Sequence, residues 1–327
     1  VAGCRGRAGA AGPGIDVAVV PNADVSVRLD LKTLRDSPIG KKFQELKDQR
    51  EKDDPAFAGN TEQRDRIEKA SGITRKDVES LLITADLGAI DFKSAGGSML
   101  AANFQGVLAV GLAKAISMDQ LREAARLIAQ DRASGTVQDV NLGGVTAIKL
   151  SPSAAGQPSA YAATSPDGRI IYITINELSL TGVLTRQREA TRERASPALL
   201  EAERGMPSDA QVKAVFIAPE ALRQAIKDKL ATADGNPAAT LVMGFIKPLE
   251  GLRSLALHAE FTQQARVGFD VTLDSADNAT RLAMLMPGLM AFAPAVAAAV
   301  TPDMMKGVTF TNIGPVVSLR LTITEHD

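Results

Sequence analysis

The chain contains no tryptophan, only two tyrosines, and an aromatic content of 4%. Proteins that bind single-stranded nucleic acids or sugars commonly stack bases and rings on aromatic side chains. The charges are also balanced, since 37 basic and 38 acidic side chains give a formal net charge of -1. Such a chain has no long-range field to attract nucleic acid. The composition therefore argues against a nucleic-acid partner.

Cysteine and histidine are equally scarce. Cys4 is the single cysteine, which excludes a disulfide within the chain and a cysteine-rich metal site. The two histidines are His258, in an expected strand, and His326, next to the last residue. Only His258 is placed to serve a Ser-His-Asp system, and a single strand histidine is more often structural or solvated. We expect neither a metal site nor a catalytic histidine.

The sequence also lacks the short motifs of common enzyme classes. No GxxxxGK[ST] or GxGxxG motif lies between a strand and a helix to hold a phosphate. Gly96-Gly97-Ser98 is not followed by the second glycine of a nucleophile elbow, and no SxxK pattern is present. These absences predict a protein that is not an enzyme and that needs no cofactor.

One stretch of the sequence occurs twice. Val25 to Leu46 has the pattern of an alternating strand that runs into a helix, and Val212 to Leu230 repeats it. Further on, Leu252 to Phe261 matches Val78 to Leu87 without a gap, and the order of the matches is preserved. Self-similarity of this kind indicates an internal duplication.

The pattern predicts an α+β fold built from two repeats, at residues 16–205 and 206–327. Each repeat has the element order β-α-β-β-α-β of a ferredoxin-like unit, with an added hairpin strand. Alternation of apolar and polar residues in nearly every strand predicts sheets that are open on one face. The core is then expected between the other face and two helices. The short apolar run Ile15 to Val20 is expected to form an edge strand.

Several local signals place the ends of elements. Ser37, followed by Pro38, is expected to cap a helix, as are Ser117 and Asn176. The sequence Ser165 to Gly168, with proline and then Asp-Gly, predicts a hairpin turn. An arginine-rich run that begins at Arg186 alternates with glutamates at a spacing that predicts a solvated helix with internal ion pairs.

The segment Leu282 to Val300 has no charge and is almost long enough to span a bilayer. Because Pro287 and Gly288 interrupt it, we expect two helical pieces, 276–286 and 289–300. Four interpretations stay open: burial between the repeats, a dimer interface, a membrane-facing patch, or the wall of an apolar ligand pocket. The candidate interface or ligand residues are Met284, Met286, Leu289, Met290 and Phe292.

A carboxylate-based hydrolase is a further hypothesis. Asp86 and Glu260 occupy equivalent positions in the two repeats, so they are able to pair across a pseudo-twofold axis. The simpler interpretation is that both are exposed strand carboxylates inherited from one ancestor.

The N-terminal residues Val1-Ala2-Gly3-Cys4 resemble the lipobox of bacterial lipoproteins. In that family, the signal peptide is cut before the cysteine, which then carries lipid. The resemblance implies lipid attachment at Cys4 and a lipid-anchored, periplasmic location in the bacterial cell envelope. The small residues that follow predict a disordered tether over residues 1–15. The alternative is a chance match at a disordered terminus.

A second resemblance involves the first strand and helix. Pro21, Asp24, Asp30-Leu31, Leu34 and Ser37-Pro38 are similar to the opening of large envelope proteins of unknown function in Planctomycetes and Verrucomicrobia. The resemblance implies no activity. We expect a non-catalytic, lipid-anchored envelope protein that binds a protein partner or acts as a scaffold. The alternative is a carrier or chaperone for an apolar ligand held by the Leu282–Val300 segment. The sequence does not indicate the oligomeric state.

Overall fold

The computed structural model describes residues 14–53, 55–88, 105–131, 135–154, 157–191, 195–232, 247–296 and 307–323.

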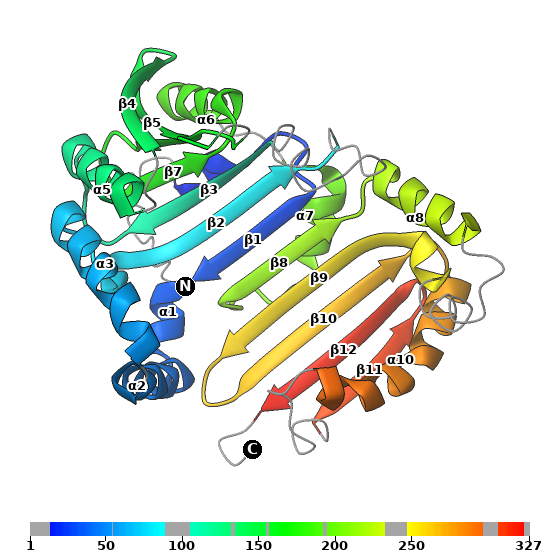
Figure 1. The fold of residues 1–327 in the computed structure, drawn as a ribbon. Helices are drawn as coiled ribbons and strands as arrows, with labels where there is room; N and C mark the ends of the chain where they lie inside the picture. The colour runs from blue at the N-terminus through cyan, green and yellow to red at the C-terminus, as the bar shows by residue number, and fades with distance from the viewer. Residues whose placement is uncertain are drawn as a thin grey trace, which may run out of the picture.

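A single twisted sheet of twelve strands is the framework of the described chain (Figure 1). Its order is β11-β12-β10-β9-β8-β1-β2-β3-β7-β6-β5-β4, and neighbouring strands are antiparallel. The strands are β1 (Val25–Asp30), β2 (Val78–Asp86), β3 (Gln105–Leu112), β4 (Gly135–Leu142), β5 (Val145–Pro152), β6 (Ala160–Thr164), β7 (Ile170–Thr174), β8 (Val212–Ile217), β9 (Leu252–Phe261), β10 (Ala265–Leu273), β11 (Val308–Ile313) and β12 (Val316–Ile323).

The helices lie on both faces and at the margins of this sheet, which confirms the α+β class. The α-helices are α1 (Leu31–Asp36), α2 (Pro38–Asp53), α3 (Pro55–Ser71), α5 (Met118–Asp131), α6 (Glu177–Glu189), α7 (Pro197–Arg204), α8 (Glu220–Thr232) and α10 (Ala276–Val296). The 3-10 helices are η1 (Ile15–Ala18), η2 (Arg75–Asp77) and η3 (Lys247–Gly251).

The strand order corrects the prediction of ferredoxin-like units. In that unit, the two strands that a helix joins are parallel and are separated by a third strand. Here β1 and β2 are immediate antiparallel neighbours, with Asp30 opposite Ser80. The chain leaves the sheet after β1 and returns to it at the same end after the intervening helices. It therefore runs through β2 in the opposite direction. The sheet also continues across the boundary at 205/206, because Val27 of β1 pairs with Ala214 of β8.

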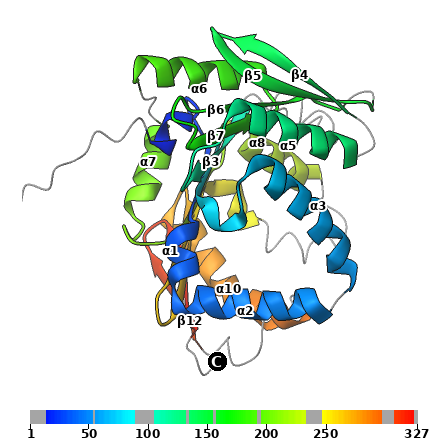
Figure 2. The same cartoon turned by 90° about the vertical axis from the view of Figure 1, so that its left-hand side faces the viewer.

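One face of the sheet, which bears Ser26 and Arg28 of β1, is packed against α6, α7 and η1; we call it the covered face (Figure 2). The largest core cluster lies there. Leu82 and Tyr172 of the sheet are completely buried in it, together with Leu180 of α6. Burying such side chains contributes about 1.5–3 kcal/mol each.

The segment Ile15 to Val20 is not the edge strand that its apolar run predicts. It begins as η1, and Val17 is completely buried against the covered face. Arg186 of α6 donates to the carbonyls of Val17 and Val19 at 3.2 and 3.1 Å, and is itself buried. The first arginine of the charged run therefore holds the N-terminal segment in place instead of facing solvent.

The opposite face, which bears Val25, Val27 and Leu29, is called the open face. Two smaller core clusters form at its ends, one beside α5 and one beneath α8 and α10. Leu121 of α5 contributes to the first, and Leu282 of α10 to the second. The expected core on one face alone is therefore wrong: apolar residues occupy both faces of the sheet.

Helix α10 runs from Ala276 to Val296 without the break expected at Pro287 and Gly288. A proline removes only the hydrogen bond to the residue four positions earlier, so a long helix continues past it when flanking turns are intact.

The local signals at element ends are confirmed. The Ser37 hydroxyl accepts from the Gly40 amide at 3.0 Å, and Ser117 accepts from the Gln120 amide at 3.2 Å. The Asn176 side chain caps α6 in the same way. Gly168 has φ +68°, which is the left-handed conformation that the β6–β7 turn requires.

Candidate binding site

The open face carries a continuous row of apolar side chains that are only partly buried. They belong to eight neighbouring strands and are not members of any of the three core clusters. Among the described helices, none lies in front of the central strands β2, β1, β8 and β9 in Figure 1. The most exposed member, Ile83, is 37% exposed. We call this row the apolar strip: Val25, Val27, Leu29, Leu81, Ile83, Leu108, Ile173, Val212, Ala214, Leu257, Val267, Leu319 and Leu321.

The register shows that the strip is one surface. Val27 of β1 is opposite Ile83 of β2 and Ala214 of β8, and residues paired in antiparallel strands point to the same face. Ala214 is in turn opposite Leu257 of β9. The strip therefore crosses the centre of the sheet without interruption by a charged side chain.

Helix α2 projects from the sheet on the same side and has an exposed apolar surface of its own (Figure 2). Phe43 is 64% exposed and Leu46 is 57% exposed. Lys41, Gln44 and Asp48 line a polar hollow on the side of α2 toward α3. With 100° between successive residues, Phe43 and Leu46 lie on the opposite side of the helix.

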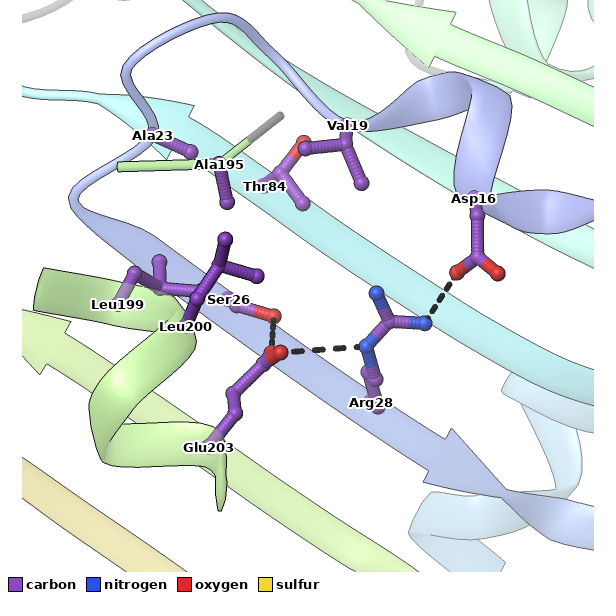
Figure 3. Close-up of a pocket in the computed structure, with 10 residues that line it drawn as sticks. All are labelled: Asp16, Val19, Ala23, Ser26, Arg28, Thr84, Ala195, Leu199, Leu200 and Glu203. Atoms are coloured by element: carbon purple, nitrogen blue, oxygen red, sulfur yellow. Dashed lines mark hydrogen bonds and ion pairs between the residues drawn. The ribbon is translucent and has the colours of Figure 1, made fainter. Parts of the chain in front are cut away.

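A different cavity lies on the covered face, between β1, η1 and α7 (Figure 3). Its volume is about 440 Å³. Arg28 Nη1 is 2.5 Å from Asp16 Oδ1, and Arg28 Nε is 3.6 Å from Glu203 Oε1. Ser26 Oγ donates to the same Glu203 oxygen at 2.8 Å. The other wall is apolar and is formed by Val19, Ala23, Ala195, Leu199 and Leu200.

The proposed pair of catalytic carboxylates does not form. Asp86 ends β2 beside Val25, at the start of β1. Glu260 follows Ala259, which the β8 register aligns with Leu29 near the end of β1. The two carboxylates thus lie at opposite ends of β1, and a strand of this length is about 20 Å long. The hydrolase hypothesis is wrong for this pair.

His258 is buried on the covered face between Lys213 and Gly268, its partners in the neighbouring strands. Its Nδ1 has no hydrogen-bond partner among the described residues. Burial lowers the pKa of His258, the charge of Arg320 lowers it further, and Asp270 opposes both effects. The ring therefore packs against Gly268, and the lowered pKa favours its neutral form.

No family model matches this sequence. No curated protein matches it either. Among solved structures the chain is similar to one described as "Structure of crystal form I of TP0453", with 11% sequence identity and a TM-score of 0.43. The match covers 96% of this chain and 94% of that chain. The function of this chain therefore has to be inferred from its own residues.

The residues predicted for an apolar site are only partly brought together. Met286 packs against the core cluster beneath α10, whereas Met284, two positions earlier, is 74% exposed. The side chains of Leu289, Met290 and Phe292 lie outside the described residues, as does Cys4. The apolar segment thus contributes one face to the core and leaves Met284 in solvent.

Among the described residues, no group of three or more histidine, cysteine, aspartate or glutamate side chains is arranged to hold a metal ion. No helix in the described part of the chain is both long and apolar enough to cross a membrane.

Sequence reasoning missed the apolar strip, although one signal was present. Strand β2 contains the consecutive apolar residues Leu81, Leu82 and Ile83, which cannot all point to one side. Leu82 is buried on the covered face, so its two neighbours lie on the open face. Consecutive apolar residues of this kind indicate a strand that is apolar on both faces.

Proposed function

We propose that this protein is a non-catalytic binding protein of the bacterial cell envelope that holds an apolar ligand, with the chemistry of a lipid acyl chain, against its open face. The apolar strip carries the proposal. Apolar surface left in water costs about 25 cal/mol per Å², and large exposed apolar patches mark sites of interaction. Apolar side chains on eight strands stay partly exposed, although burying them would stabilise the fold. We therefore infer that this surface serves binding.

The neighbouring elements support an extended apolar ligand. Phe43 and Leu46 on α2 and Met284 on α10 offer further exposed apolar side chains beside the sheet. Methionine adapts its shape to irregular ligands. The strip has no polar group to fix the orientation of a small, specific substrate, so an acyl chain fits it better than a polar metabolite does. The non-catalytic role rests on the missing sequence motifs.

Fluorescence titration with dansylaminoundecanoic acid tests this proposal. Ile83→Lys places a charge in the strip at a site that is already 37% exposed, so the fold should tolerate it. We expect binding to weaken by at least about tenfold, or about 1.4 kcal/mol. The matched control is Ile313→Lys, at a 77% exposed isoleucine at the end of β11, which should leave binding unchanged.

Equal affinities for the unmodified chain and Ile83→Lys would contradict the proposal. Native mass spectrometry of protein extracted from its own cells adds a second readout. A bound lipid supports the carrier function, whereas a bound protein and no lipid would favour the scaffold function.

We also propose that Cys4 carries the lipid anchor that the lipobox implies. Its support is the sequence Val1-Ala2-Gly3-Cys4 and the small-residue run after it. The intact mass should include a diacylglycerol and an acyl group on Cys4, and Cys4→Ala should release the protein from the membrane fraction. An unmodified Cys4 in membrane-extracted protein would refute the anchor.

A tandem duplication, with repeats at 16–205 and 206–327, is part of the same proposal. Its support is the arrangement of the sequence matches in the sheet. The matched strands β1 and β8 pair with each other, and the matched strands β2 and β9 lie outside them. A pseudo-twofold axis between β1 and β8 relates the two pairs. Such an arrangement fuses the sheets of two related units into one continuous surface for the ligand.

A further inference from the structure

The cavity between β1 and α7 is independent of the open face, because the sheet separates them. Its volume of about 440 Å³ is within the usual range for small-molecule pockets. Figure 3 shows Arg28, Asp16 and Glu203 converging on one another, with the apolar side chains Leu199 and Leu200 beside Glu203 on α7. A polar end and an apolar wall in one cavity are the usual composition of a site for a small amphipathic molecule.

The charged end is unbalanced. Two carboxylates, Asp16 and Glu203, face one guanidinium, Arg28, so this group of three has a net charge of -1 at neutral pH. Lys213 is the partner of Arg28 across the β1–β8 pair, but its Nζ is directed to the Ser208 carbonyl at 3.1 Å. Counted over the charged groups that line the cavity, the balance therefore favours a cation over an anion.

Glu203 is the residue best placed to receive that cation. Its Oε1 interacts with Ser26 and Arg28, whereas its Oε2 accepts no hydrogen bond from a described residue. The Glu203 side chain is only 22% exposed, so water competes weakly for the free oxygen. A carboxylate in this state binds an ammonium group more strongly than an exposed one does.

We propose that this cavity binds a small organic cation: a primary ammonium group that pairs with Glu203, carrying a short alkyl chain that lies against Leu199 and Leu200. The charged end of this cavity selects an ammonium group, so its ligand differs in chemistry from the acyl chain proposed for the open face. Ser26 acts as a positioning residue, because its hydroxyl holds the orientation of the Glu203 carboxylate.

Isothermal titration calorimetry of the full chain at pH 7 tests this site with three probes of equal chain length: hexylammonium chloride, hexan-1-ol and sodium hexanoate. We expect hexylammonium to bind at least about tenfold more tightly than hexanol, and hexanoate to show no binding. Glu203→Gln keeps the size of the side chain and removes its charge, so hexylammonium should bind at least about tenfold more weakly to that variant.

The matched control is Glu201→Gln. Glu201 lies on the same helix and lines a different hollow, so this change should leave hexylammonium binding unaltered. Ile83→Lys, which alters the open face, should also leave it unaltered. Equal binding of hexanol and hexylammonium, or unchanged binding by a folded Glu203→Gln variant, would overturn the proposal. If Glu203→Gln fails to fold, the affinities of the three probes for the unmodified chain still test the proposal.

Discussion

The imidazole of His258 lies directly against Gly268 on the neighbouring strand. A Cβ atom at position 268 would be 2.2 Å from His258 Cε1 and 2.3 Å from Nε2. The contact follows from the antiparallel register of β9 and β10, which places the two residues opposite each other. Gly268 has no side chain, and the His258 imidazole occupies the space where a Cβ atom would lie.

Gly268→Ala should therefore destabilise the protein. The imidazole would have to move in a buried position, and overpacking of this kind costs about 1–3 kcal/mol. Urea unfolding followed by circular dichroism measures the change. Gly205→Ala is the control: its φ is -72° and the nearest atom to a new Cβ is 3.5 Å away, so we expect no loss of stability. Equal stability of Gly268→Ala and the unmodified chain would show that the His258 contact is easily relaxed.

The buried His258 predicts a pH dependence of stability. Burial lowers its pKa in the folded state below the ordinary value of 6.5. Between these two values the unfolded chain binds more protons, so the free energy of unfolding rises with pH. The stabilisation is complete above pH 6.5 and is lost as the pH falls below it, with a slope of at most about 1.36 kcal/mol per pH unit. Urea midpoints measured between pH 7.5 and 5 should show this slope, and His258→Gln should remove it. A slope that persists in the variant would assign the effect to other groups.

Two buried hydroxyl groups on β7 should respond oppositely to removal. Tyr172 Oη has no hydrogen-bond partner among the described residues, and burial raises the pKa of Tyr172. Thr174 Oγ1 donates to the Gly106 carbonyl at 2.6 Å and accepts from the Asn176 amide at 3.0 Å. Tyr172→Phe should stabilise the fold by about 1 kcal/mol, because an unpaired buried polar group is lost. Thr174→Val should destabilise it by about 1–3 kcal/mol. Urea unfolding midpoints test both changes, provided that the dependence of the unfolding free energy on urea concentration is unchanged. A loss of stability in Tyr172→Phe would contradict the prediction and would indicate a hydrogen-bond partner for the hydroxyl.

Local chemistry allowed much of the secondary structure to be predicted. The alternation of Val25, Val27 and Leu29 indicates β1, and the side chains of Ser37 and Asn176 mark helix starts because their oxygens accept from free amides nearby in sequence. These interactions connect residues a few positions apart. The same reasoning failed for Ile15 to Val20, since the partner that fixes this segment is Arg186, far along the chain.

The sequence by itself determined the α+β class, strand β1, and the helix starts that Ser37 and Asn176 cap. Only the tertiary structure decided which face of each strand is covered, that β1 and β8 pair within one sheet, and that Glu203 meets Arg28 in a cavity. The reason is physical. An apolar pattern that repeats every two residues shows that side chains alternate between the two faces of a strand. Which face is covered, and which register the strands adopt, depends on contacts between distant residues.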